Sequence, residues 1–125
     1  MKKEQAVKLI QTYGDAWMKQ DADLILSVFT PDATYYDPKE GEQKGHEGIR
    51  AYWMSKVIGS QRDIVFKLLN VWVEEGTVIA EWNATFVDTK RNLAIDMTEV
   101  AIFGVAGEKF SSLREYYHSE KKPIL

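Results

Sequence analysis

The chain contains no cysteine, and this absence excludes several kinds of chemistry. Disulfide bonds, a thiol nucleophile and zinc–thiolate centres all require cysteine, so none of them can be built from this sequence. A chain without disulfides is compatible with a reducing compartment. No apolar run approaches the ~20 residues needed to cross a bilayer. We therefore expect a cytoplasmic protein that makes no membrane contact.

Histidine is scarce, and positive charge is dispersed along the chain. The two histidines, His46 and His118, lack other ligands at metal-binding spacing, so no metal site is expected. The chain has 16 basic and 19 acidic residues, for a net charge of -3. The basic residues form no cluster typical of a nucleic-acid footprint. Glycine-rich phosphate loops and nucleophile-elbow motifs are also missing. We expect neither a cofactor nor a nucleic-acid partner.

Apolar and aromatic residues are plentiful enough for one bulky core. Of the 125 residues, 45% are hydrophobic and 12% are aromatic, with four tryptophans among them. This length and composition are typical of a single domain that buries most of its unfolded surface. We therefore predict one domain over residues 1–125.

Helical periodicity dominates the first half of the chain. Four residues share one face of a predicted first helix: Ala6, Ile10, Tyr13 and Trp17. A cap at Asp21 predicts a short second helix that includes residues 24–29. A strand over residues 33–36, a polar loop over 39–45 and a third helix over 49–57 are expected to follow.

Strand-like runs fill the second half of the chain. Four of them, at about 62–74, 77–88, 92–105 and 108–118, are separated by turn residues and predict an antiparallel meander. The tail at 121–125 is expected to fray. Helices followed by long strands predict an α+β fold, in which a curved antiparallel sheet wraps over three N-terminal helices like a cone.

Three ionisable side chains stand where a folding pattern alone would not place them. Tyr13 lies on the apolar stripe of the first helix, Asp37 closes a predicted strand, and Glu99 interrupts an apolar strand face. Burying a carboxyl or a phenol without a partner costs free energy, and such groups are frequent at chemical sites. These residues predict a chemical pocket.

Four segments carry a resemblance to a known family: residues 9–13 (LIQTY), 29–38 (FTPDATYYDP), 45–53 (GHEGIRAYW) and 113–117 (LREYY). Together they resemble the nuclear transport factor 2-like cone folds, and within these the SnoaL-like and ketosteroid isomerase-like proteins. The resemblance spans nearly the whole chain and implies a cone-shaped α+β fold. It does not imply one activity, because many functions share this scaffold.

The ketosteroid isomerase resemblance also implies residue roles. Asp37 matches the general base that removes a proton beside a carbonyl, and Tyr13 matches a hydrogen-bond donor to the resulting oxyanion. Glu99 matches the second donor, which is a protonated aspartic acid in the isomerase. Glutamate is one methylene longer than aspartate, and this departure argues against steroid isomerisation itself.

Nine further residues are expected to line the pocket: Trp17, Tyr35, Tyr52, Trp53, Trp82, Phe86, Met97, Glu115 and Tyr117. Glu115 is a second inward-facing acid and a competing general base. Structural explanations exist beside the chemical ones, since Tyr13 can be a core-edge tyrosine and Asp37 a turn former. Glu99 can form an ion pair with Arg91, Arg114 or Lys109.

Three functions follow from these patterns. The first is a cofactor-free isomerase, cyclase or hydrolase that acts on a small apolar substrate. The second is a binding protein for an apolar ligand without catalysis. The third is an association module, which a pocket filled by aromatic side chains would favour. The mixed outer face of the sheet predicts a homodimer through that face.

Overall fold

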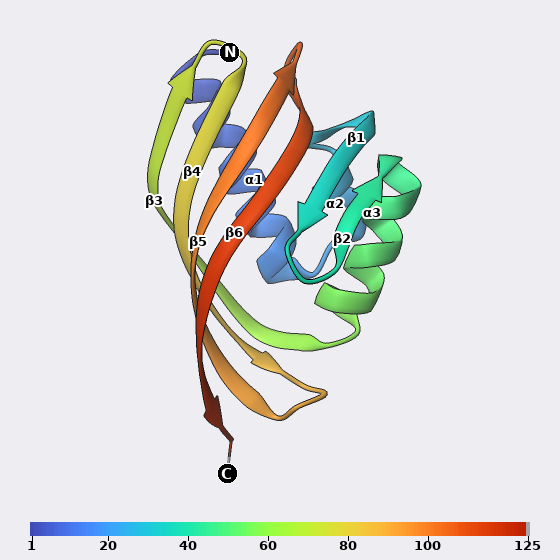
Figure 1. The fold of residues 1–125 in the computed structure, drawn as a ribbon, viewed down its shortest axis with the longest axis vertical. Coiled ribbons are helices and arrows are strands. Elements are labelled where there is room, and N and C mark those ends of the chain that lie inside the picture. The colour runs from blue at the N-terminus through green and yellow to red at the C-terminus, as the bar shows by residue number, and fades with distance from the viewer. Residues whose placement is uncertain (125) are drawn as a thin grey trace.

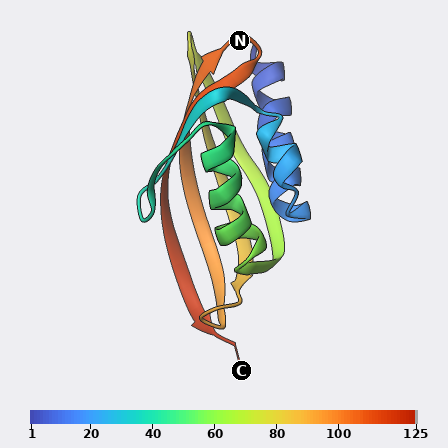
Figure 2. The same cartoon turned by 90° about the vertical axis from the view of Figure 1, so that its right-hand side faces the viewer.

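A computed structural model describes residues 1–124 as a strongly curved, open sheet with helices on its concave side (Figures 1 and 2). The six strands lie in the order β2-β1-β6-β5-β4-β3. The helical elements are α1 (Lys3–Lys19), α2 (Ala22–Leu26), α3 (Gly45–Trp53) and a π-helical turn, η1 (Met54–Ile58). The strands are β1 (Phe29–Asp37), β2 (Gly41–Lys44), β3 (Gln61–Glu74), β4 (Thr77–Asp88), β5 (Leu93–Ala106) and β6 (Lys109–Pro123). The predicted α+β architecture is confirmed.

Helix α1 buries the face that the sequence predicted and packs against β3. A Cβ atom on Gly14 would lie 2.2 Å from the Phe66 ring, so glycine permits the close approach of helix and strand. The helix ends where Gln20 adopts a left-handed conformation and its N–H donates to the Ala16 and Trp17 carbonyls. This docking fixes the position of Tyr13, which lies nearly two turns before the end of the helix.

Helix α2 is shorter than predicted, and β1 begins earlier. Asp21 caps the helix as expected, because its side chain accepts the Leu24 N–H. The helix ends at Leu26, and Phe29 already pairs with Phe110 of β6. This pairing joins residues far apart in sequence, so local periodicity could not reveal it. Pro31 is tolerated because it falls within a register irregularity of β1.

The sheet is mixed, whereas an antiparallel sheet was predicted. Strands β3 to β6 form the predicted antiparallel meander, but β1 runs parallel to β6. The segment predicted as a loop contains β2, which pairs with β1 across a turn at residues 38–40 and begins at Gly41, where φ is +84°. The tail was also predicted wrongly as far as Pro123, which pairs with Leu93 on β5. Leu125 lies outside the described residues.

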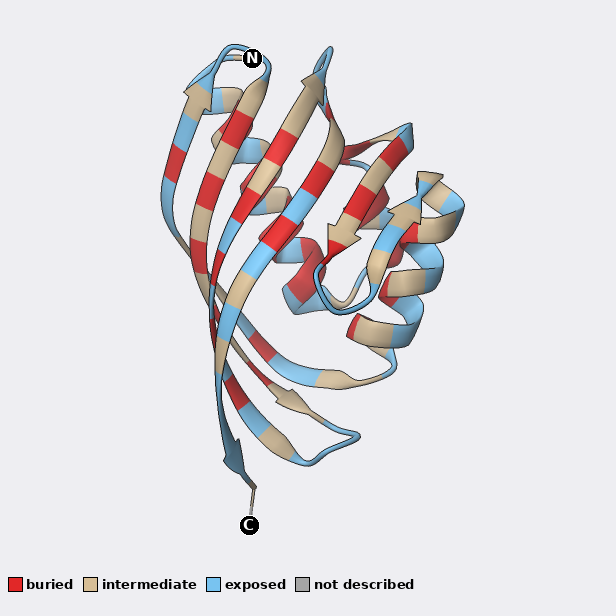
Figure 3. Ribbon diagram, viewed as in Figure 1, coloured by how far each residue is buried: buried red, intermediate tan, exposed pale blue. Residues whose placement is uncertain are grey.

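Alternation along β4 and β5 divides the sheet into a buried concave face and a partly exposed convex face (Figure 3). The buried side chains include Trp82 and Phe103, which pack beneath α1 against Tyr13. No helix among residues 1–124 is both long and apolar enough to cross a membrane.

Candidate active site

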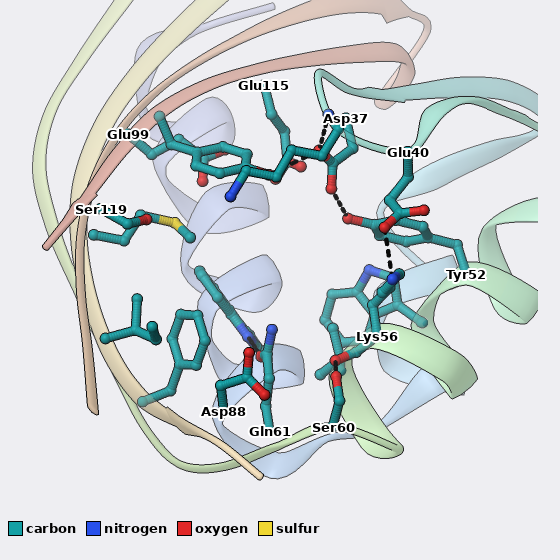
Figure 4. A pocket seen from close by; sticks show the side chains of 18 of the residues that line it. Asp37, Glu40, Tyr52, Lys56, Ser60, Gln61, Asp88, Glu99, Glu115 and Ser119 are labelled. Carbon is teal, nitrogen blue, oxygen red and sulfur yellow. Dashed lines mark hydrogen bonds and ion pairs between the residues drawn. The ribbon is translucent and has the colours of Figure 1, made fainter. Parts of the chain in front are cut away.

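A cavity of about 390 Å³ opens between the concave face of the sheet and the helices (Figure 4). It is lined by residues from α1, β1, α3, η1 and strands β3 to β6. Eleven of the residues singled out in the sequence contribute to its wall: Tyr13, Trp17, Tyr35, Asp37, Tyr52, Trp53, Phe86, Met97, Glu99, Glu115 and Tyr117. The aromatic side chains therefore leave the cavity open.

Trp82 was expected in the wall, and this prediction was wrong. Its side chain is fully buried, with its ring 5.2 Å from the Tyr13 ring and 5.2 Å from the Phe66 ring. Strand alternation correctly indicates the face on which Trp82 lies. It does not indicate depth, and at this level of the cone α1 fills the space over the sheet.

Asp37 lies at the end of β1, and its carboxylate accepts three hydrogen bonds. The Tyr52 hydroxyl donates to Oδ2 in a very short contact, and the Tyr117 hydroxyl donates to Oδ1 at 2.8 Å. The backbone N–H of Lys39 also donates to Oδ1, at 2.9 Å. Three of its roughly four acceptor positions are therefore occupied, so Asp37 is firmly positioned.

Tyr13, Tyr35 and Glu115 form a hydrogen-bonded triangle. The two hydroxyl oxygens are 2.8 Å apart, and they lie 3.1 Å and 3.3 Å from Glu115 Oε1. Each tyrosine has one hydroxyl proton, so both protons are used within the triangle when Glu115 is ionised. Tyr13 therefore supports Glu115 in this geometry and does not offer its proton to the cavity.

Glu99 is 1% exposed, and its Oε2 atom has no hydrogen-bond partner among the described residues. It lies on β5 diagonally across from Glu115 on β6, because Ala101 pairs with Glu115 and Glu99 pairs with Tyr117. Diagonal neighbours on one sheet face are close enough to interact. None of the four ion pairs among residues 1–124 includes Glu99, so the basic partners considered from the sequence do not bind it.

Burial shapes the ionisation of the site. Burial first, and the nearby Glu115 charge second, raise the pKa of Glu99 well above its ordinary value. Burial also raises the pKa of Glu115 to about 7. The hydrogen-bonding proton of the neighbouring Glu99 opposes this rise most strongly, the Asp37 charge adds to it, and hydrogen bonds from Tyr13 and Tyr35 oppose it further. The pKa values of Tyr13 and Tyr35 are raised by burial and then by the Glu115 charge, so both remain protonated.

The cavity rim carries charged and polar residues that sequence reasoning missed: Lys39, Glu40, Lys56, Ser60, Gln61, Asp88, Lys90, Arg91, Ser119 and Lys121. Lys56 forms a 2.6 Å ion pair with Glu40. The Lys39 ammonium lies 5.5 Å from the centre of the Tyr117 ring, within the range of a cation–π contact. Inward alternation along β6 was the available signal for Ser119 and Lys121, which lie on the same face as Glu115 and Tyr117.

Among residues 1–124, no group of three or more His, Cys, Asp or Glu side chains is placed to hold a metal ion. The three buried acids instead have tyrosine partners or, for Glu99 Oε2, none. The arrangement can exchange a proton near neutral pH and can offer the proton of a neutral carboxylic acid.

The chain belongs to the SnoaL-like domain family, whose family model matches residues 10–113. This match runs from the middle of α1 to the first part of β6. It includes the buried acids Asp37 and Glu99, whereas Glu115 lies two residues beyond it. No curated protein shows a significant match to the chain. The family fits the cone architecture and a cavity between sheet and helices.

Solved structures share the fold at low sequence identity. An NTF2-like protein from Anabaena variabilis is 21% identical, with a TM-score of 0.82 over 97% of this chain and 92% of that one. A protein with a ketosteroid isomerase-like fold from Catenulispora acidiphila is 16% identical, with a TM-score of 0.78 over 86% and 83%. An LEH-like epoxide hydrolase from M. tuberculosis is 14% identical, with a TM-score of 0.75 over 92% and 84%. At these identities the likeness establishes the fold alone.

Proposed function

We propose that this protein is a cofactor-free acid/base enzyme that acts on a small molecule held in the cavity. The observation that carries the proposal is the pairing of Glu99 and Glu115, two buried carboxyls on the cavity wall without a cationic partner among residues 1–124. A structural pair would be expected to have a cation or a complete set of hydrogen bonds, since unpaired buried carboxyls are costly.

Glu115 is the proposed general base. A pKa of about 7 means that it can lose and regain a proton near neutral pH, which suits proton transfer. The two tyrosine hydroxyls hold one of its oxygens in place. Asp37, the base implied by the isomerase resemblance, acts through its negative charge, which helps to raise the pKa of Glu115.

Glu99 is the proposed acid. With its pKa raised well above the ordinary value, it carries a proton that it can donate to a substrate oxygen. In the proposed step, Glu115 removes a proton from the carbon beside a carbonyl, and the C–H electrons shift to form an enol as Glu99 protonates the oxygen. Return of the proton to carbon from Glu115, with return of the enol proton to Glu99, restores both acids.

This step is common to isomerisation and to the aldol-type ring closure of a cyclase. A protonated acid can also assist epoxide opening, which is the chemistry named for the M. tuberculosis relative. Proton transfer is thus the shared element of the proposal, and it can be tested without knowledge of the natural substrate.

Deuterium exchange of 2-tetralone, a compact apolar ketone, tests this proposal by NMR in heavy water. The wild-type chain should accelerate exchange beside the carbonyl, and Glu115→Gln should reduce the acceleration by about 10²–10⁴-fold, the usual contribution of a general base. Glu120→Gln is a matched control on the exposed face of the same strand. Full exchange activity in Glu115→Gln would refute the assignment.

A non-catalytic binding protein is the alternative, and the same experiment distinguishes it. Binding of 2-tetralone to the wild-type chain without any acceleration of exchange would favour a protein that only holds its ligand. The open cavity supports both functions.

We also propose that the convex face of the sheet pairs with a second copy of the chain. Exposed apolar side chains gather there, including Trp72, Val100 and Tyr116 at 52%, 39% and 48% exposure. Trp72 pairs with Ile79, and Val100 pairs with Tyr116, so these residues extend across adjacent strands. Light scattering should show a dimer that Trp72→Lys converts to a monomer; a monomeric wild-type chain would refute this pairing.

A further inference from the structure

Charge is divided between two sides of the cavity. Figure 4 shows Glu115 and Asp37 on one side, with Asp88, Gln61 and Ser60 on the other. The side with Glu115 and Asp37 contains the proposed proton-transfer residues. A negatively charged ligand group is disfavoured there, because it would approach buried acids and raise the free energy of their ionised forms.

The side around Asp88 has an excess of positive charge. Asp88 Oδ1 accepts the backbone N–H groups of Lys90 and Arg91 at 3.0 and 3.1 Å, and Oδ2 accepts Arg91 Nε at 2.7 Å. Arg91 compensates the negative charge of Asp88. The three contacts together fix the hairpin between β4 and β5. Lys90 and Lys121 both line the cavity, and neither forms an ion pair among residues 1–124.

Gln61 adds an oriented donor to this side. The Trp17 indole N–H donates to Gln61 Oε1 at 2.8 Å. An indole nitrogen can only donate, so the amide oxygen must face Trp17. The Gln61 NH₂ group has no hydrogen-bond acceptor among residues 1–124 and belongs to the cavity wall. It is available to an acceptor atom of a ligand.

We infer that the ligand has an apolar body and an anionic group of the carboxylate class, bound by Lys90, Lys121 and the Gln61 amide. The charge division then sets the orientation, with the neutral, reactive part of the ligand directed toward Glu99 and Glu115. This last statement rests on the proposed function, whereas recognition of the anionic group does not.

A pair of matched probes tests the inference. 2-Naphthylacetate and 2-naphthylacetamide have nearly the same size and apolar body, but only the first is anionic. Binding to the full chain can be followed by quenching of Trp17 and Trp53, which line the cavity, and by calorimetry. The acetate should bind about tenfold more tightly at low ionic strength, the scale expected for a few exposed charge contacts. Added salt should weaken acetate binding alone.

Lysine substitutions test where the carboxylate group of the probe binds. Lys121→Gln should weaken acetate binding about threefold, and Lys90→Gln combined with Lys121→Gln about tenfold, while amide binding stays unchanged. Lys122→Gln is the matched control, because Lys122 is the next residue of β6 and does not line the cavity. It should leave the affinity for both probes as in the wild-type chain.

Equal affinity for the two probes would overturn the inference while leaving the proposed function intact, since the neutral amide still occupies the cavity. Equal losses in Lys121→Gln and Lys122→Gln would overturn it as well, by showing only a general charge effect. Failure of both probes to bind would refute recognition of apolar carboxylates. Failure of the proposed function is separate and would appear as normal deuterium exchange in Glu115→Gln.

Discussion

Replacement of Glu115 by glutamine should change how the stability of the protein depends on pH. Glu115 has a folded-state pKa of about 7 against an ordinary value of 4.5, and burial is the largest cause of the difference. Below pH 4.5 the carboxyl is protonated in both states, so its contribution to stability is fully present. As pH rises toward 7, the unfolded chain ionises first, and the free energy of unfolding falls.

The magnitude follows from the same values. Each pKa unit corresponds to about 1.4 kcal/mol, so the loss between pH 4.5 and 7 is roughly 3 kcal/mol. Above the folded-state pKa the loss is complete, and the free energy of unfolding no longer depends on this group. Domains are stable by only about 5–15 kcal/mol, so the effect is large enough to measure. In Glu115→Gln this contribution should be absent.

Urea unfolding followed by tryptophan fluorescence, at about pH 5 and pH 8, provides the assay. The fall in unfolding free energy between the two conditions should be smaller in Glu115→Gln than in the wild-type chain by roughly 3 kcal/mol. Glu108→Gln, in the exposed turn before β6, should behave like the wild-type chain. An identical pH dependence in the wild-type chain and Glu115→Gln would refute the reasoning about a buried, protonated Glu115.

Other substitutions test the remaining parts of the site. Asp37→Asn removes a negative charge that raises the pKa of Glu115, so the pH profile of deuterium exchange should move to lower pH; an unchanged profile would contradict this coupling. Tyr13→Phe removes a hydrogen bond that lowers the pKa of Glu115, so the same profile should move to higher pH, and a shift to lower pH would count against the triangle. Glu99→Leu should change the free energy of unfolding by less than about 1 kcal/mol or increase it, because a buried carboxyl without a partner at Oε2 is replaced by an apolar side chain. A loss of several kcal/mol in urea unfolding would instead indicate a buried ion pair.

Local periodicity was sufficient to predict much of the fold. The buried face of α1 follows from its 3.6-residue spacing, and the inward positions of Glu99 and Glu115 follow from alternation along β5 and β6. These signals lie within single helices and strands, so they can be detected in a single sequence. The cap at Asp21 belongs to the same group, since its hydrogen bond spans three residues.

Features that depend on distant pairing could not be predicted in this way. The early start of β1 and its parallel alignment with β6 depend on contacts such as Tyr35 with Leu113. The three-donor environment of Asp37 likewise requires Tyr52 from α3 and Tyr117 from β6. Alternation along a strand predicts which face of the sheet a side chain lies on, but not how far along the cone it lies. Trp82 was therefore predicted on the correct face but wrongly in the cavity wall.

The parallel pairing of β1 with β6 also has a consequence for biosynthesis. It brings Asp37 near Tyr117, and the triangle joins Tyr13 to Glu115, so each contact links the first part of the chain to its last strand. Contacts with such long sequence separation form slowly, because a large loop must close before they are made. A nascent chain from which β6 has not yet emerged therefore has neither the acid/base site nor a complete cavity wall, and its concave face stays exposed until β6 pairs with β1.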